Sequence, residues 1–141
     1  MKRIQSRMRL GLVAVFPFLV PVGPAASQVA LFDSAQVTAA CLAAPDLCEA
    51  HINAAVSALQ AAGLSGEVFH TQLGILASLV LAVVLDPAVA NPNAIAPLLE
   101  HVASASGDAA QAQAIRTVVA HVADGNLSLI QPGPAFAASP T

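Results

Sequence analysis

The sequence predicts an all-α protein, a small antiparallel bundle of four to five helices around a buried central helix, preceded by a signal peptide. The central helix is indicated by residues 73–85, an uncharged run in which only Gly74 and Ser78 interrupt the aliphatic side chains. A helix that is apolar on every side has to be surrounded by lipid or by other helices. This run is shorter than the roughly 20 residues that span a bilayer. Before and after it, apolar residues recur at spacings of three and four, which is typical of helices with one buried face.

Residues 1–27 have the three parts of a secretory signal peptide in the right order. A basic start with four Lys or Arg residues is followed by an apolar stretch over residues 10–20 and by small residues at 25–27, where cleavage would occur. The alternative is an uncleaved membrane anchor, but Pro17, Pro21 and the short apolar stretch argue against a span. We therefore expect a periplasmic or secreted protein with no stable membrane span after cleavage.

Removal of this segment leaves very few charges on the mature chain. Arg116 is then the only Lys or Arg against eight acidic residues, a net charge of −7 with neutral histidines. Because affinity for nucleic acid depends on Lys and Arg displacing counterions from phosphates, the sequence excludes nucleic acid as a partner. A surface of mainly alanine and small polar residues favours contact with a protein partner or self-association.

The two cysteines, Cys41 and Cys48, are predicted to form one disulfide, as is usual in exported chains. In one continuous helix their Cα atoms would lie about 10.5 Å apart at ~1.5 Å per residue, whereas a disulfide needs roughly 4.4–6.8 Å. The helix must therefore break between them, and Pro45 supplies the break because proline starts helices but does not continue them. The alternative is a free pair, or a zinc-ligand pair joined by His51.

Turn and capping residues divide the mature chain into five predicted helices. Asp33 and Asp108 are each followed three residues later by glutamine, the pattern of an N-terminal capping box. Pro97 limits the fourth helix, whose regular part is expected to start at or just before that residue. The predicted helices span residues 33–43, 45–63, 66–85, 93–105 and 108–123.

The predicted domain boundaries follow from this division. Residues 28–125 are expected to form the bundle, and residues 126–141, which contain three prolines and show no helical period, a mostly flexible tail. Within that tail Leu127, Leu129 and Ile130 are candidates for docking on the bundle.

Four polar residues are weak candidates for a metal site: Glu67, His70, His101 and His121. Glu67 and His70 have the Glu-x-x-His spacing of di-iron bundles, but those sites need two such motifs and two further glutamates. Nucleophile motifs, phosphate-binding glycine-rich loops and the zinc-protease motif are absent from the sequence. We therefore expect a non-enzymatic protein without cofactor that acts by protein–protein contact. The alternative is a helical bundle that binds a metal or small ligand through its His and Glu residues.

Overall fold

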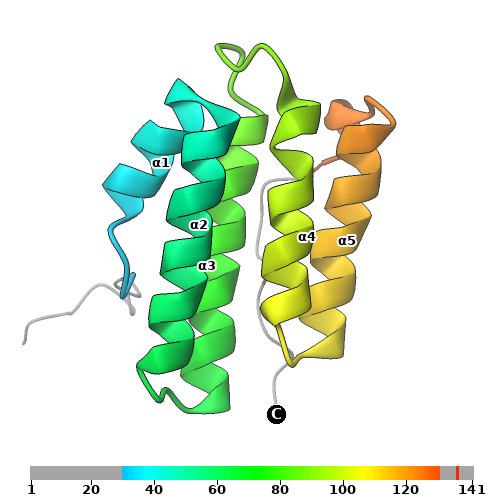
Figure 1. Ribbon diagram of the computed structural model, residues 1–141. Coiled ribbons are helices and arrows are strands. Elements are labelled where there is room, and N and C mark those ends of the chain that lie inside the picture. The colour runs from blue at the N-terminus through cyan, green and yellow to red at the C-terminus, as the bar shows by residue number, and fades with distance from the viewer. Residues whose placement is uncertain (1–29, 131–135, 137–141) are drawn as a thin grey trace, which may run out of the picture.

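The computed structural model describes residues 30–130 and residue 136, and this part of the chain is all-helical (Figure 1). Successive helices run in alternating directions, which confirms the predicted antiparallel bundle. The predicted signal peptide lies outside the described residues. The α-helices are α1 (Ser34–Ala43), α2 (Pro45–Ala61), α3 (Gly66–Val84), α4 (Ala96–Ala105) and α5 (Ala109–Ala123), and the 3₁₀ turns are η1 (Pro92–Ala94) and η2 (Leu127–Leu129).

The helix starts follow from the capping residues. Asp33 Oδ1 accepts a hydrogen bond from Gln36 N at 3.0 Å before α1, and Asp108 Oδ1 accepts one from Gln111 N at 2.8 Å before α5. Each bond satisfies one of the backbone donors that a helix N-terminus leaves unpaired. Ser65 immediately precedes α3, but its side chain makes no capping bond.

The helix ends depend on backbone conformation that the sequence also indicates. Gly63 after α2 and Gly125 after α5 have positive φ values of 63° and 72°, which glycine adopts without the cost that a Cβ would add. The three residues 63–65 are too few for any connection other than an antiparallel helical hairpin. Residues 93–105 are not one helix, because η1 is followed by a fresh start at Ala96 with Pro97 in its first turn, where proline needs no donor.

The central helix is α3, which contacts each of the other four α-helices. Leu73, Leu76 and Val80 are fully buried in the core, whereas Ser78 and Ala82 on its outer side are exposed. By length and apolar composition α3 could cross a membrane, but half of its most apolar window is buried inside the bundle. That burial is typical of the core helix of a soluble bundle.

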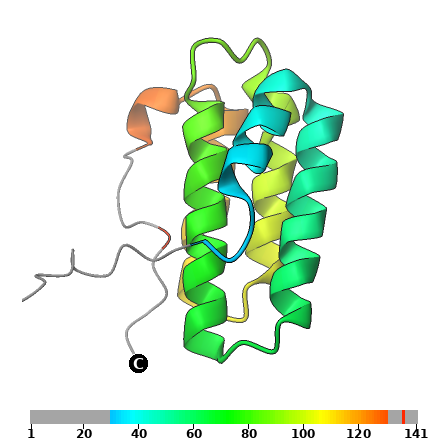
Figure 2. The same ribbon diagram turned by 90° about the vertical axis from the view of Figure 1, so that its left-hand side faces the viewer.

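The disulfide between Cys41 and Cys48 is present and joins α1 to α2, with the two Cα atoms 4.0 Å apart, slightly closer than the usual range for a disulfide. Between the two helices Ala44 is extended and Pro45 begins α2, so the predicted break lies where the bridge requires it. Both cysteine sulfurs are bonded to each other in the bridge. They are therefore not available as thiolate ligands, which removes the alternative of a zinc site formed with His51. Figure 2 shows the short α1 lying across the gap between α2 and α3, both of which it contacts. A formed disulfide is consistent with an oxidising compartment.

Two glutamines are buried and tie non-helical segments to the core. Gln72 Oε1, on α3, accepts a hydrogen bond of 2.7 Å from the backbone N of Leu31 and so fixes the lead-in to α1. Gln111, on α5, has no exposed surface and bonds the backbone of His70 and of Phe136. A buried amide is stable only when it is hydrogen-bonded, and these partners supply that.

The segment after α5 contributes to the core more than its sequence indicates. Ile130 is buried and Leu127 is partly buried against the core, which confirms docking for both, whereas Leu129 is 60% exposed, so docking is wrong for that residue. Phe136 is only 2% exposed and belongs to the core. The packed unit therefore extends past residue 125, while the rest of the predicted flexible tail lies outside the described residues.

Removal of the disulfide is expected to destabilise the protein. Cys41→Ser should lower the free energy of unfolding by about 2–3 kcal/mol, because the bridge closes a short loop in the unfolded chain. Thermal melting with and without reductant measures the effect, and the variant itself should be insensitive to reductant. Equal melting temperatures of the wild type under both conditions would contradict this role.

Gly74→Ala is expected to destabilise the protein even though alanine favours a helix by about 1 kcal/mol over glycine. A Cβ on Gly74 would lie 2.5 Å from the carbonyl oxygen of Phe136, a backbone atom that cannot move without displacing the tail. We expect a net loss of about 1–3 kcal/mol, as for other overpacked positions. Gly66→Ala, in the same helix with nothing within 4 Å of its Cβ, is the matched control and should leave the melting temperature unchanged or raise it.

Candidate functional site: a polar groove between α2 and α4

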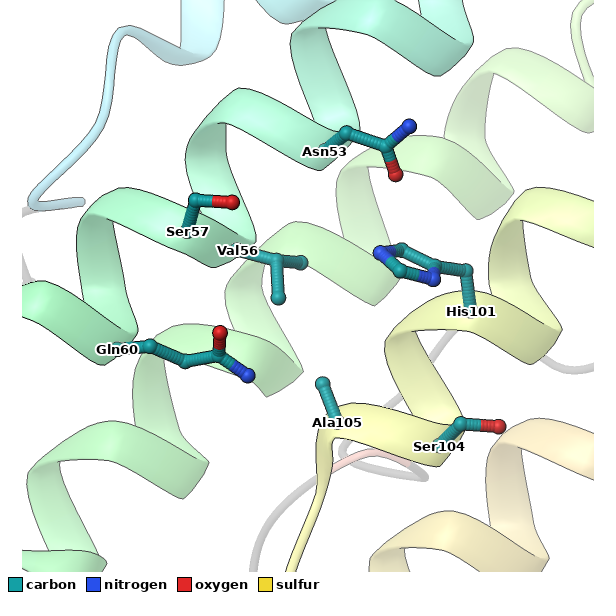
Figure 3. A pocket seen from close by; sticks show the side chains of 7 residues that line it. All are labelled: Asn53, Val56, Ser57, Gln60, His101, Ser104 and Ala105. Atoms are coloured by element: carbon teal, nitrogen blue, oxygen red, sulfur yellow. The ribbon is translucent and has the colours of Figure 1, made fainter.

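An open groove of about 390 Å³ lies between α2 and α4 (Figure 3). The two helices contact each other, and side chains from both line the groove. The lining residues are Asn53, Val56, Ser57 and Gln60 from α2, and His101, Ser104 and Ala105 from α4.

The groove exists because the facing side chains are short or polar. Val56 is 3% exposed and forms the apolar floor, while Ser57, Gln60 and Ser104 are exposed at its edges. Asn53, Ser57 and Gln60 recur at spacings of four and three along α2, so they lie on one face of that helix. Serine and alanine on α4 leave room where longer side chains would close the gap.

A second hollow of about 290 Å³ continues the groove toward the turn between α2 and α3 and shares Gln60 and Ala105 with it. Its other lining residues are more apolar than those of the first hollow. They are Leu59, Gly63, Leu64 and Phe69. The two hollows together offer hydrogen-bonding groups along α2, with the apolar side chains of Leu64 and Phe69 beside them at one end.

The chemistry of this lining is that of binding. It offers two amides, two hydroxyls and one imidazole, all of which donate and accept hydrogen bonds. His101 is its single titratable side chain, so the lining has no second group to act as acid, base or charged partner. Uncharged groups that hydrogen-bond, such as peptide amides, match this lining.

The four metal candidates do not converge. Within residues 30–130 and 136, no group of three or more His, Cys, Asp or Glu side chains is placed to hold a metal ion. Glu67 is exposed in the first turn of α3 and His101 is exposed in the groove. His70, in the second turn of α3, and His121, in the last turn of α5, lie at opposite ends of the bundle because these helices run in the same direction.

The contacts of His70 are those of a residue that holds the fold together. Its ring is tilted against that of Phe69, with centroids 5.9 Å apart, and its Nε2 lies 3.3 Å from where a Cβ on Gly107 would be. The backbone carbonyl of His70 also accepts a bond from Gln111. These contacts join α3 to the turn between α4 and α5.

Sequence analysis singled out His101 but none of the other groove residues. Asn53, Ser57 and Gln60 form a polar stripe beside the apolar stripe of α2, a signal indistinguishable from an ordinary solvated face. Only the approach of α4, which brings His101 and Ala105 opposite this stripe, makes it a groove.

Comparison of the chain with protein-family models, with curated proteins and with solved structures finds no match. The function is therefore inferred from the chemistry of the groove and of the surface around it.

Proposed function

We propose that this chain is an exported, non-catalytic helical protein that binds another protein through the groove between α2 and α4. The observation that carries the proposal is the uncharged, hydrogen-bonding lining of an open groove with one titratable side chain. Protein interfaces combine apolar and polar groups, and the side chains of Leu64 and Phe69 lie beside the polar stripe of α2.

The partner segment expected from this chemistry is uncharged and polar, with an apolar side chain for the hollow near Phe69 and Leu64. A charged segment would find no oppositely charged side chain among the lining residues. Within residues 30–130 and 136, five large apolar side chains are substantially exposed. These are Leu31, Leu42, Leu47, Val68 and Leu129.

Two features support export. The disulfide between Cys41 and Cys48 is of a kind that persists in oxidising compartments. The signal-peptide pattern of residues 1–27 is the independent sequence feature that predicts the same location. The proposed location is the periplasm or the cell exterior.

The competing hypothesis, a bundle that binds a metal or small ligand through His and Glu residues, has less support. Of the four candidates only His101 lines the groove. A closed metal site needs several converging ligands, and the side chains of Glu67, His70 and His121 come from other parts of the bundle.

Site-specific photo-crosslinking tests the groove. A photoreactive amino acid in place of Gln60, in cells that produce the protein, should give an adduct of discrete mass. The same amino acid in place of Gln113, an equally exposed glutamine on α5, should not. The second substitution Ser104→Arg should abolish the Gln60 adduct, because it places a charge opposite the polar stripe of α2. Equal adducts from both positions, or none from Gln60, would refute the proposed interface.

Intact mass measurement tests the location. Protein from the envelope or culture fluid should begin near Gln28, and its two thiols should react with an alkylating reagent only after reduction. A full-length chain with freely reacting thiols would place the protein in a reducing compartment and overturn export.

A further inference from the structure

A second binding element lies between α3 and α5, away from the groove, and has Gln111 at its centre. The side chain of Gln111 is fully buried. Its Nε2 donates hydrogen bonds of 2.7 Å to the backbone carbonyls of His70 and of Phe136, and its Oε1 accepts one of 2.7 Å from the hydroxyl of Ser106. One amide thus joins α3, the turn before α5 and the C-terminal segment.

Gly74 forms the other wall of this element. A Cβ at Gly74 would lie 2.5 Å from the carbonyl oxygen of Phe136 and 3.3 Å from Gln111 Nε2. The absence of a side chain therefore lets a peptide backbone approach α3 closely enough to reach the amide of Gln111. The side chain of Phe136 completes the contact by entering the core, where it is 2% exposed.

The slot, defined by Gly74 and Gln111, thus receives the backbone carbonyl of Phe136, and the ring of the same residue is buried in the core. Neither feature depends on the covalent link to α5. Between Ile130 and Phe136 the sequence is Gln-Pro-Gly-Pro-Ala, with two prolines and a glycine. Exchange of an identical segment between two chains is a low-cost route to dimers.

We propose that the slot is a peptide-recognition site that the chain's own Phe136 fills within one molecule and that Phe136 of a second copy fills in an exchanged dimer. The second copy is the occupant because its tail offers the same carbonyl and the same ring, and so reproduces every contact with Gly74 and Gln111. Within one molecule the link holds Phe136 at a high effective concentration, so exchange competes with self-occupation. This site is separate from the groove between α2 and α4, and its failure would leave the proposed function intact.

A complementation experiment tests the site with two full-length variants. Phe136→Ala keeps the backbone carbonyl that Gln111 binds but removes the ring that enters the core, and so weakens occupation of the slot by the chain's own tail. Gly74→Ala obstructs the slot but keeps Phe136 and frees its tail. Each variant alone should be a monomer by size-exclusion chromatography with light scattering. Their equimolar mixture should form a one-to-one heterodimer in which the tail of the second variant occupies the slot of the first.

The controls separate recognition from misfolding. Both variants must show the helical circular dichroism of the wild type, and Gly66→Ala must not replace Gly74→Ala as a partner of Phe136→Ala. A mixture that stays monomeric while both variants are folded overturns the proposal. Heterodimer formed equally well with Gly66→Ala overturns it too, because that variant's own slot is unobstructed.

A peptide measurement decides the question if either variant fails to fold. A synthetic peptide of residues 133–139 should raise the melting temperature of Phe136→Ala, since a ligand that binds only the folded state stabilises it. The same peptide with Ala in place of Phe136 should have no effect, and neither peptide should shift the wild type, whose slot is filled. No shift with the Phe-containing peptide would overturn the proposal.

Discussion

The burial of α3 is the constraint on which the rest of the structure depends. Each fully buried leucine, such as Leu73 or Leu76, contributes roughly 1.5–3 kcal/mol through removal of apolar surface from water. The ion pair between Glu100 and Arg116, at 2.9 Å, has side chains 43% and 45% exposed, and an exposed pair of this kind contributes about 0–1 kcal/mol. The bundle is therefore held by apolar contact, and α1, α2, α4 and α5 are placed where they cover α3.

Apolar contact is not directional, and the two buried glutamines supply the direction that it lacks. Gln72 accepts from Leu31 at one side of α3, and Gln111 donates to Phe136 at another. Each bond specifies where a segment without its own helix must lie, because a buried amide that loses its partner costs about 1–3 kcal/mol.

The groove between α2 and α4 differs from these buried sites, because polar side chains at its edges are exposed. Ser57 and Gln60 are exposed to solvent, where a partner can reach them, while the hydroxyl of Ser104 donates to Glu100 Oε1 at 3.3 Å.

The sequence predicted the local features of the fold well, because they depend on neighbouring residues. Asp33 and Asp108 cap their helices, Gly63 and Gly125 end theirs, and Pro45 breaks the chain between the two cysteines, all within reach of a short sequence window. These signals placed the helices to within a residue or two. The regular part of the fourth helix begins at Ala96, just before Pro97 as predicted, and a 3₁₀ turn precedes it.

What the sequence did not predict depends on contacts between distant residues. Phe136 has no periodic neighbours that would mark it as a core residue, and Gln111 resembles any glutamine near a helix start. Their bond spans 25 positions and exists only once Gly74 lies beside both. The groove could not be predicted from the sequence for the same reason, since Ser57 and Ser104 line one groove only because α2 packs on α4. The four metal candidates all have side chains that can bind a metal ion, but within the described residues the fold does not bring three or more such side chains together.

The order of Gly74, Gln111 and Phe136 along the chain also bears on when the core can be completed. Chains are made from the N-terminus onward, and domains fold as their parts become available. Gly74 and Gln111 both precede Phe136, so Gln111 lacks its second carbonyl acceptor, and the core one of its aromatic rings, until Phe136 has been made. The helices can therefore pack before the core is complete, and synthesis of Phe136 sets the earliest moment at which the buried amide of Gln111 is fully bonded.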